Sequence, residues 1–293
     1  MAATWFGSEW RAAGSSAGRL TFCWQVQPYP PHEPLFARDG TYLSQYPAKN
    51  DEHRLYPEIS AFVRRRSAER KMTTLLNPPL STLLKGLFAD ADATDRALER
   101  QRAGLSDEDR ADPDDYRALY SSLKDFHLAV SRETGSMLYV LARAIRARSI
   151  VEYGTSFGIS TLHLAAALKD NGGGRLIGTE FEPSKVKRAR ENLTAAGLSD
   201  LVEIREGDAI QTLAHDLPDR IDFLLLDGAK SLYLKVLALL EPRLREGALI
   251  VADNANWCSD YLARVRTPAA GYLSVPVAGD VELSMKLGQS ARE

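Results

Sequence analysis

Apolar residues follow two different patterns along the chain. Over residues 79–148 they recur at helical spacing, as in LSTLLKGLF and again in TGSMLYVLARAI, which predicts helices. After Ser149, short β-rich runs alternate with helical ones, a pattern typical of a parallel sheet covered by helices. The strand candidates are SIVEY, RLIGT, LVEIR, IDFLLL and ALIVA, and the pair GYLSVPV and VELSMKL is expected to close the sheet. The pattern indicates an α/β fold.

The helices expected between these strands are ISTLHLAAALK, PSKVKRARENLTAAG and SLYLKVLALLEPRL. Gly197 is well placed to end the second of them, and an acidic stretch over residues 106–115 is the expected break in the earlier helical part. We therefore divide the chain into an unassigned segment (1–71), a helical cap (72–148) and an α/β domain (149–293).

Residues 1–71 show neither a sustained helical period nor strand alternation. Two interpretations stay open. The stretch RRRSAERK ends just before Met72, which suggests that Met72 is the true start and that the preceding segment is an extension outside the native protein. The other interpretation is a disordered appendage.

Composition is that of an ordinary soluble protein, with 44% apolar and 26% charged residues. The net charge of −2 supplies no broad positive field, so nucleic acid is not an indicated partner. Cys23 and Cys258 lack metal-type spacing, which argues against a zinc site or a disulfide framework. With neither a long apolar run nor a leader pattern, we expect no membrane association and a cytoplasmic location.

The segment VEYGTSFGIST is the first candidate for ligand binding. Glu152 ends a strand, Gly154 and Gly158 lie in the turn around Thr155, and Ser160 opens a helix. Glycines let backbone approach a ligand, and free N–H groups at a helix start attract anionic atoms. The structural alternative is a tight strand-to-helix turn without a ligand.

Two further strand ends carry acidic residues. Glu180 can accept hydrogen bonds from two adjacent ribose hydroxyls at the sheet edge. Asp208 and Ala209 are suited to framing an adenine, although Asp208 taken alone is more often a turn residue. A nicotinamide cofactor should show G-x-G-x-x-G, whereas Gly154 and Gly158 are four apart, so dinucleotide binding is the weaker interpretation.

Together these motifs resemble the class I S-adenosylmethionine-dependent methyltransferases over about residues 131–287. The resemblance implies a Rossmann-like, mostly parallel seven-stranded sheet with helices on both faces, and S-adenosylmethionine as cofactor. It implies that Glu152 and Gly154 flank the methionine portion, Ser160 its carboxylate, Glu180 the ribose, and Asp208 with Ala209 the adenine. Thr155, Gly158 and Asp227 complete the candidate cofactor site.

Two strand ends remain, and both are polar. IDFLLL ends at Asp227, and ALIVA at Asp253 and Asn254. Oxygen ligands from adjacent strand ends can converge on a hard cation such as Mg²⁺. The alternative, that both Asp side chains merely cap the following helices, is weakened by finding acid at both ends together with Asn254.

Lys230 follows Asp227 by three residues and is a candidate general base or electrostatic stabiliser for a hydroxyl at the cation. DGAK with VADNANW resembles the divalent-metal catechol and caffeoyl-CoA O-methyltransferases. That resemblance implies Asp227, Asp253 and Asn254 as metal ligands and Asp227 with Lys230 as catalytic residues. The chain departs from the family at Ala229 and in LSVPVAGD, where relatives often carry another acid, so recognition of both catechol hydroxyls is in doubt.

The expected function is methylation of a small, hydroxylated, catechol-like aromatic acceptor by a homodimeric enzyme. The alternatives are methylation of hydroxyuridine in tRNA, an NAD-dependent oxidoreductase, and a non-catalytic module that only binds the cofactor. Trp257 either stacks on the acceptor or is a buried aromatic. His163 and the other histidines are expected to pack or lie on the surface.

Overall fold

A seven-stranded sheet is the central feature of the computed structural model, which describes residues 35–36, 42–43, 73–102 and 116–288. Its strands are β3 (Ser149–Tyr153), β4 (Arg175–Glu180), β5 (Val202–Glu206), β6 (Ile221–Leu226), β7 (Leu244–Ala252), β8 (Tyr272–Ala278) and β9 (Val281–Lys286). Their order is β5-β4-β3-β6-β7-β9-β8. The first five in this order are parallel, and β9 pairs antiparallel with both β7 and β8. The predicted α/β fold is confirmed.

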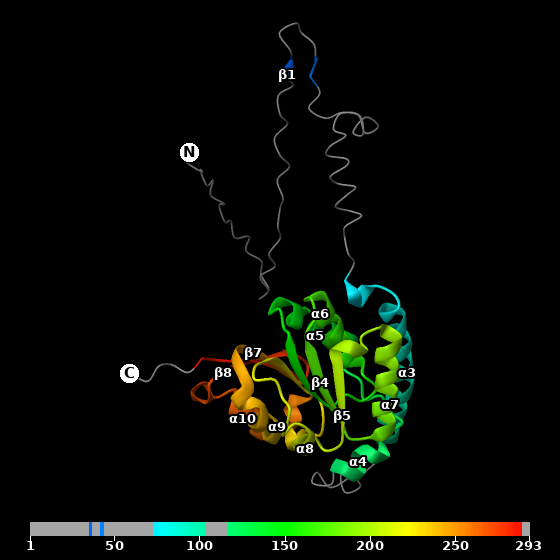
Figure 1. Ribbon diagram of the computed structural model, residues 1–293, viewed down its shortest axis with the longest axis vertical. Helices are drawn as coiled ribbons and strands as arrows, with labels where there is room; N and C mark the ends of the chain where they lie inside the picture. Colours follow the sequence, from blue (N-terminus) through cyan, green and yellow to red (C-terminus); the bar gives the residue numbers. More distant parts are fainter. Residues whose placement is uncertain (1–34, 37–41, 44–72, 103–115, 289–293) are drawn as a thin grey trace, which may run out of the picture. The chain divides into compact units, whose positions relative to one another are not determined.

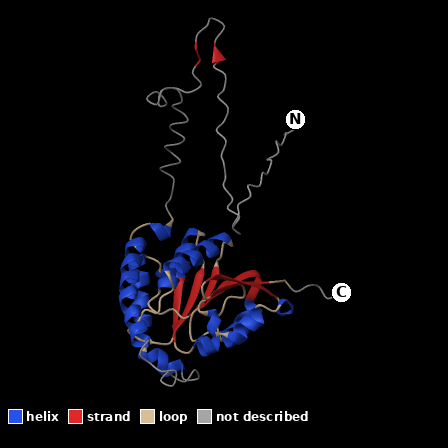
Figure 2. Cartoon of the chain, turned by 180° about the vertical axis from the view of Figure 1, so that it is seen from behind, coloured by secondary structure: helices blue, strands red, loops and turns tan. Residues whose placement is uncertain are grey.

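Helices cover both faces of the sheet (Figures 1 and 2). They are α3 (Leu80–Arg102), α4 (Tyr116–Ser122), α5 (Arg132–Ala144), α6 (Ile159–Asp170), α7 (Pro183–Ala196), α8 (Ala209–Thr212), α9 (Tyr233–Leu240) and α10 (Ser259–Val265). Apolar residues of α3, α5, α6 and α7 pack in one core, whereas those of α8, α9 and α10 pack in a second core across the sheet. Alternate side chains of each strand point to opposite faces and so supply both cores.

Short 3₁₀ turns connect several of these elements. They are η1 (Thr74–Leu76), η3 (Ser199–Leu201), η4 (Lys230–Leu232), η5 (Glu241–Arg243), η6 (Ala255–Trp257) and η7 (Pro268–Ala270). The predicted helix SLYLKVLALLEPRL is divided into η4, α9 and η5. Helix α9 ends before Pro242, because proline cannot donate the hydrogen bond that would continue it. Gly197 ends α7 in the left-handed conformation, as predicted.

The predicted helical cap corresponds to α3, α4 and α5. Helices α3 and α5 both pack on α6, whose residues are almost all buried. The Asp170 carboxylate at the end of α6 accepts hydrogen bonds from the Thr74 backbone N–H (2.9 Å) and the Tyr139 hydroxyl (2.7 Å), which ties η1 and α5 to α6. The predicted break over 106–115 lies outside the described residues. No helix in the described part of the chain is long and apolar enough to cross a membrane.

The chain divides into two units, Met1–Arg70 and Lys71–Glu293. Within the first unit, the described residues form a short antiparallel pair of β1 (Leu35–Phe36) and β2 (Tyr42–Leu43). The other residues of the segment 1–71, for which the sequence assigned no fold, lie outside the described residues.

Candidate active site

The predicted site residues lie where the chain reverses its direction of travel across the sheet. From β3 the chain proceeds to β4 and β5, and β6 then returns to the other side of β3. At such a switch point the connections after the two neighbouring strands continue in opposite directions across the sheet, which favours a ligand site at the carboxyl ends. Here those loops begin at Gly154 after β3 and at Asp227 after β6.

The two loops approach each other so closely that glycine is required. Gly154 has φ +95°, and a Cβ on it would lie 2.2 Å from the Asp227 carbonyl oxygen. A Cβ on Gly228 would lie 2.4 Å from the Tyr153 ring. Both distances are far below van der Waals contact, so the loop carrying the cofactor candidates is in direct contact with the loop carrying the metal and catalytic candidates.

Glu152 and Ser160 contact each other in a buried polar cluster behind the glycine turn. The Ser160 hydroxyl donates to Glu152 Oε1 at 2.7 Å, and Thr155 donates to Oε2 at 3.1 Å. Thr161 also donates to Oε2. Because Glu152 is completely buried, desolvation raises the pKa of its carboxyl to about 7 against these hydroxyl donors. The cluster fixes the turn, and the direct ligand roles of Glu152 and Ser160 stay predictions.

Glu180 connects the first turn to the start of α7. Its carboxylate accepts hydrogen bonds from the backbone N–H of Ser156 (2.7 Å) and of Glu182 (2.9 Å). Each carboxylate oxygen can accept about two hydrogen bonds, so both oxygens retain capacity for ribose hydroxyls. Gly158, at φ +89°, begins α6 directly after this turn.

Asp208 has partners that the sequence pattern did not predict. Its Oδ1 accepts the Ile210 N–H at 2.9 Å and caps α8, which is the predicted turn role. Its Oδ2 accepts the Tyr116 hydroxyl at 3.0 Å and pairs with the Arg117 guanidinium. Helix α4 therefore lies against the residue assigned to the adenine, while the neighbouring Ala209 is buried in the sheet core.

Asp227, Lys230 and Asp253 lie together after β6 and β7. The Lys230 ammonium donates to Asp227 Oδ1 (3.4 Å) and to the Asp253 carbonyl oxygen (3.2 Å). Burial raises the pKa of the Asp227 carboxyl well above its usual range; Lys230 opposes this shift and the nearby Asp253 carboxylate adds to it. Burial likewise raises the pKa of Asp253. Lys230 therefore only partly offsets the cost of placing two carboxylates at this site.

Asn254 and Asp280 complete this group. Asn254 follows β7 in the left-handed conformation, and its amide nitrogen donates to Asp280 Oδ2 at 2.6 Å. Asp280 lies between β8 and β9, in the LSVPVAGD segment where the sequence indicated that an additional acid was missing. The structure corrects that interpretation, because this acid reaches the candidate metal ligands through Asn254.

The donor set suits a hard divalent cation. The carboxylates of Asp227 and Asp253 repel each other, and with the Asn254 amide they offer oxygen ligands, which Mg²⁺ prefers. The hydrogen bond to Asp280 fixes the amide of Asn254 by its nitrogen and leaves its carbonyl oxygen available to a cation. Within the described residues no three His, Cys, Asp or Glu side chains form a metal-binding group, so the candidate set consists of two carboxylates and the Asn254 amide.

Trp257 and His163 resolve two of the sequence alternatives. Trp257 is 66% exposed, so the interpretation as a buried aromatic is wrong. His163 is buried, its Nδ1 lies 2.8 Å from the Ile159 carbonyl oxygen, and its ring meets Phe88 edge-on. The predicted packing role of His163 is confirmed. Cys258 is a free, buried thiol.

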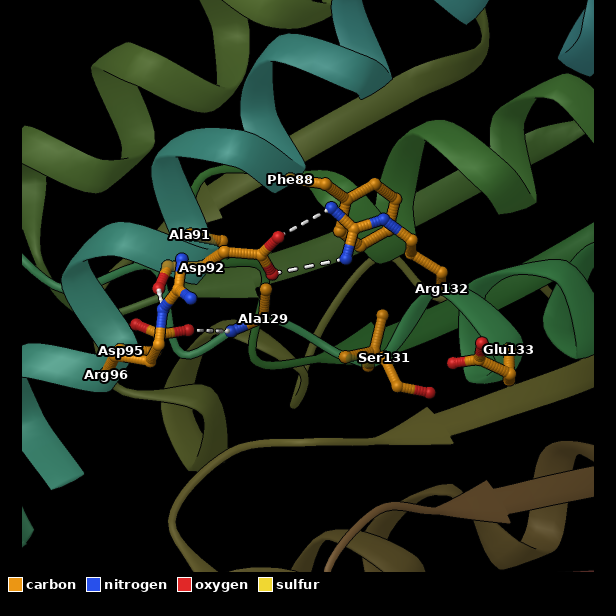
Figure 3. A pocket seen from close by; sticks show the side chains of 10 residues that line it. Phe88, Ala91, Asp92, Asp95, Arg96, Ala129, Ser131, Arg132 and Glu133 are labelled. Carbon is orange, nitrogen blue, oxygen red and sulfur yellow. Dashed lines mark hydrogen bonds and ion pairs between the residues drawn. The ribbon is translucent and has the colours of Figure 1, made fainter.

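A cavity of about 310 Å³ lies beside the first turn of α5, and Figure 3 shows its lining. Arg132 donates to both oxygens of Asp92 and lies over the Phe88 ring, and Asp95 accepts the Ala129 N–H. None of the predicted cofactor, metal or catalytic residues lines it. We therefore place the candidate site at the sheet edge and not in this cavity.

The part of the chain that carries these residues is similar to known proteins. Residues 151–255 match a family model described as a methyltransferase domain. A catechol O-methyltransferase of Niastella koreensis is 37% identical over 130 residues, which cover 43% of this chain and 58% of that protein. A caffeoyl-CoA O-methyltransferase of Eucalyptus globulus is 27% identical over 150 residues, which cover 50% and 60% of the two chains. The chain thus spans less than two thirds of the length of these relatives.

Solved structures share the fold. The cofactor-bound crystal structure of Rv0187 from MTB covers 78% of this chain and 96% of its own, with 24% sequence identity and a TM-score of 0.53. At this level of identity the similarity establishes the Rossmann-like architecture, and it confirms the fold class that the sequence resemblance implied.

Proposed function

We propose that this chain, which carries a methyltransferase domain at residues 151–255, is an S-adenosylmethionine-dependent O-methyltransferase that acts on a small aromatic acceptor with adjacent hydroxyl groups. The observation that carries the proposal is the contact between Gly154 and the Asp227 backbone. A cofactor bound at the glycine turn would lie directly beside Lys230 and the half-buried carboxylates of Asp227 and Asp253. Methyl donor and acceptor oxygen would then meet at one edge of the sheet.

The residues around the glycine turn are suited to the three parts of the cofactor. Free N–H groups at the start of α6 suit its carboxylate, and the unused acceptor capacity of Glu180 suits the ribose hydroxyls. Asp208, held by α4, would lie at the adenine. The buried cluster around Glu152 keeps this turn rigid, so that little conformational entropy is lost on binding.

Asp227, Asp253 and Asn254 would hold the divalent cation. When bound, such a cation lowers the pKa of an acceptor hydroxyl and orients its oxygen. Two of the three side chains that would hold it are fixed in advance, since Asp227 contacts Lys230 and Asn254 contacts Asp280. Preorganised ligands of this kind are what a selective cation site requires.

Lys230 fits the role of electrostatic stabiliser better than that of general base. An ammonium group has three N–H donors, and Lys230 has three acceptors: Asp227 Oδ1, the Asp253 carbonyl and the Tyr233 hydroxyl. A positive charge beside the acceptor favours loss of its hydroxyl proton to solvent. The oxygen then bonds to the methyl carbon as the carbon–sulfur bond breaks, and S-adenosylhomocysteine leaves.

The test is methyl transfer from labelled S-adenosylmethionine to catechols, hydroxycinnamoyl thioesters and tRNA, each with and without EDTA. We expect transfer to a small dihydroxy aromatic compound and loss of transfer in EDTA. Asp227→Asn should abolish transfer, whereas Asp260→Asn, an exposed change on α10, should leave it intact. Transfer to tRNA alone would overturn the acceptor class, and full activity in EDTA would overturn the cation. Homodimerisation and cytoplasmic location stay predictions.

A further inference from the structure

The Lys230 side chain is held by a residue that the sequence presents as part of the core. Tyr233 begins α9 and is fully buried among apolar side chains of the second core, in edge-on contact with Tyr153 and Tyr261. Its hydroxyl accepts a hydrogen bond from Lys230 Nζ at 2.7 Å, which is the shortest of the three contacts of that ammonium. The hydroxyl is thus the polar end of an otherwise apolar residue.

The same hydroxyl also fixes the loop after β7. Tyr233 donates its proton to the Asp253 carbonyl oxygen at 2.8 Å, and Lys230 donates to that oxygen at 3.2 Å. Lys230, the Tyr233 hydroxyl and the Asp253 carbonyl therefore form a closed triangle of hydrogen bonds. Because the Tyr233 ring is locked by packing, it gives the flexible lysine stem a fixed point of attachment.

We propose that Tyr233 is a positioning residue that holds the Lys230 ammonium against the carboxyl ends of β6 and β7, where the methyl acceptor is proposed to bind. The proposal rests on the proposed function for its catalytic consequence, although the positioning itself is a property of the protein alone. Without the hydroxyl, Lys230 loses its shortest contact and gains freedom to leave the site toward solvent.

A matched control separates positioning from packing. Tyr261 is also fully buried and belongs to the same aromatic cluster, and its ring centroid lies 5.8 Å from that of Tyr233. Its hydroxyl has no contact with Lys230 among the hydrogen bonds of the described residues. Tyr233→Phe and Tyr261→Phe thus each remove one buried hydroxyl, but only the first removes a Lys230 partner.

The first experiment needs no methyl transfer. A short pulse of an amine-acetylating reagent on the whole protein, followed by peptide mass spectrometry, gives the modification rate of Lys230 relative to the exposed Lys235 on α9. A hydrogen bond to a charged group is strong enough that Tyr233→Phe should raise this ratio about tenfold. Tyr261→Phe should leave it unchanged. Equal ratios in the wild type and Tyr233→Phe, with both proteins folded by thermal melting, overturn the proposal.

The second experiment measures the catalytic consequence on the best acceptor. Tyr233→Phe should lower kcat about tenfold and leave the KM for S-adenosylmethionine unchanged, because the glycine turn is not altered. In a Lys230→Met background the same change should have no further effect on kcat, since the two residues act as a unit. A full additional loss in that background overturns the proposal. If the wild type methylates no acceptor, the proposed function fails while the labelling result still decides the positioning role.

Discussion

Glu152 illustrates how one buried carboxylate makes stability depend on pH. It is fully buried, and its pKa in the folded protein is about 7, against 4.5 for the free side chain. Between these two values the folded state binds more protons than the unfolded state, so stability falls as pH rises through this window. Above about pH 7 the loss in free energy of unfolding becomes constant, on the order of 3 kcal/mol for one carboxylate with this pKa shift.

Glu152→Gln should remove that dependence, because an amide has no proton to lose. We expect the free energy of unfolding of the wild type to decline between about pH 4.5 and 7 more steeply than that of the variant. Urea unfolding at a series of pH values measures both curves. Glu191→Gln, an exposed change on α7, is the control and should follow the wild type. Parallel curves for wild type and Glu152→Gln would contradict the raised pKa of Glu152.

The sequence pattern supplied those candidate site residues that lie at the end of a strand or directly after it. Glu180, Asp227 and Asp253 each follow an apolar run, and parallel strands present such ends at one edge. Tyr233 could not be predicted in this way, because the apolar residues of its helix indicate only a core position. Its proposed role depends on the direction of its hydroxyl group, which a sequence pattern does not give. Asp280 was missed because its place beside Asn254 depends on pairing of β9 with β7, a contact between residues far apart in sequence.

At the scale of elements, α4 is the part of the helical cap that contacts the candidate site. Arg117 and Tyr116 bind the Asp208 carboxylate, and the Tyr120 hydroxyl donates to the Gly228 carbonyl oxygen at 3.3 Å. One short helix thus contacts the loop assigned to adenine and the loop beside the metal candidates. Docking of α4 and binding of the cofactor should therefore influence each other.

Arg117→Ala should loosen α4 without unfolding the protein, because the Arg117 side chain is 54% exposed and such ion pairs contribute little to global stability. We expect faster hydrogen exchange in the amides of α4 and weaker cofactor binding, with an effect that shrinks in high salt. Arg175→Ala breaks an exposed pair with Glu203 at the start of β4, at the opposite end of the strands, and should change neither. Unaltered exchange in α4 would show that the Asp208 contact does not hold the helix.

The strands and the long helices were predictable, whereas the short helices were not. All seven strands and the helices α6 and α7 appear where the apolar periods indicated. The helices α8 and α10 have four and seven residues, too few for a helical period to stand out from a loop. Strand β7 begins at Leu244, before the predicted ALIVA run, because Leu244 already pairs with Ile221 of β6. The register shifts between Ile221 and Phe223, so the earlier part of the strand does not continue the apolar pattern.

At the scale of the whole domain, the switch point joins the two halves of the sheet. The half that starts at β3 carries the cofactor candidates, and the half that starts at β6 carries the cation and catalytic candidates. They touch at Gly154, where side chains are excluded by both the backbone angle and the Asp227 carbonyl. A fold of this kind brings two partial sites together at the neighbouring ends of two paired strands, β3 and β6.

Gly154→Ala should therefore damage both functions at once. The added Cβ would have to displace the Asp227 backbone, so we expect the variant to be less stable. We also expect at least a tenfold loss of affinity for cofactor and cation. This is roughly the effect of removing a supporting contact of a metal site. Gly173→Ala is the matched control: it has φ +102° and no atom within 4 Å of the added Cβ, so it carries the backbone strain without the collision. Calorimetric titration measures the affinities of the two variants, and thermal melting measures their stability. Equal affinities and equal stabilities would contradict the importance of the contact between Gly154 and the Asp227 backbone.

We have proposed that the strand ends of β6 and β7 hold one divalent cation. Titration of the full chain with Mn²⁺, followed by the loss of the free-ion electron paramagnetic resonance signal, tests this without any acceptor or cofactor. We predict one tight ion per chain, abolished by Asp253→Asn, weakened about tenfold by Asp280→Asn and unaffected by Asp260→Asn. Tight binding that survives Asp253→Asn, or no tight binding in the wild type, would contradict the account.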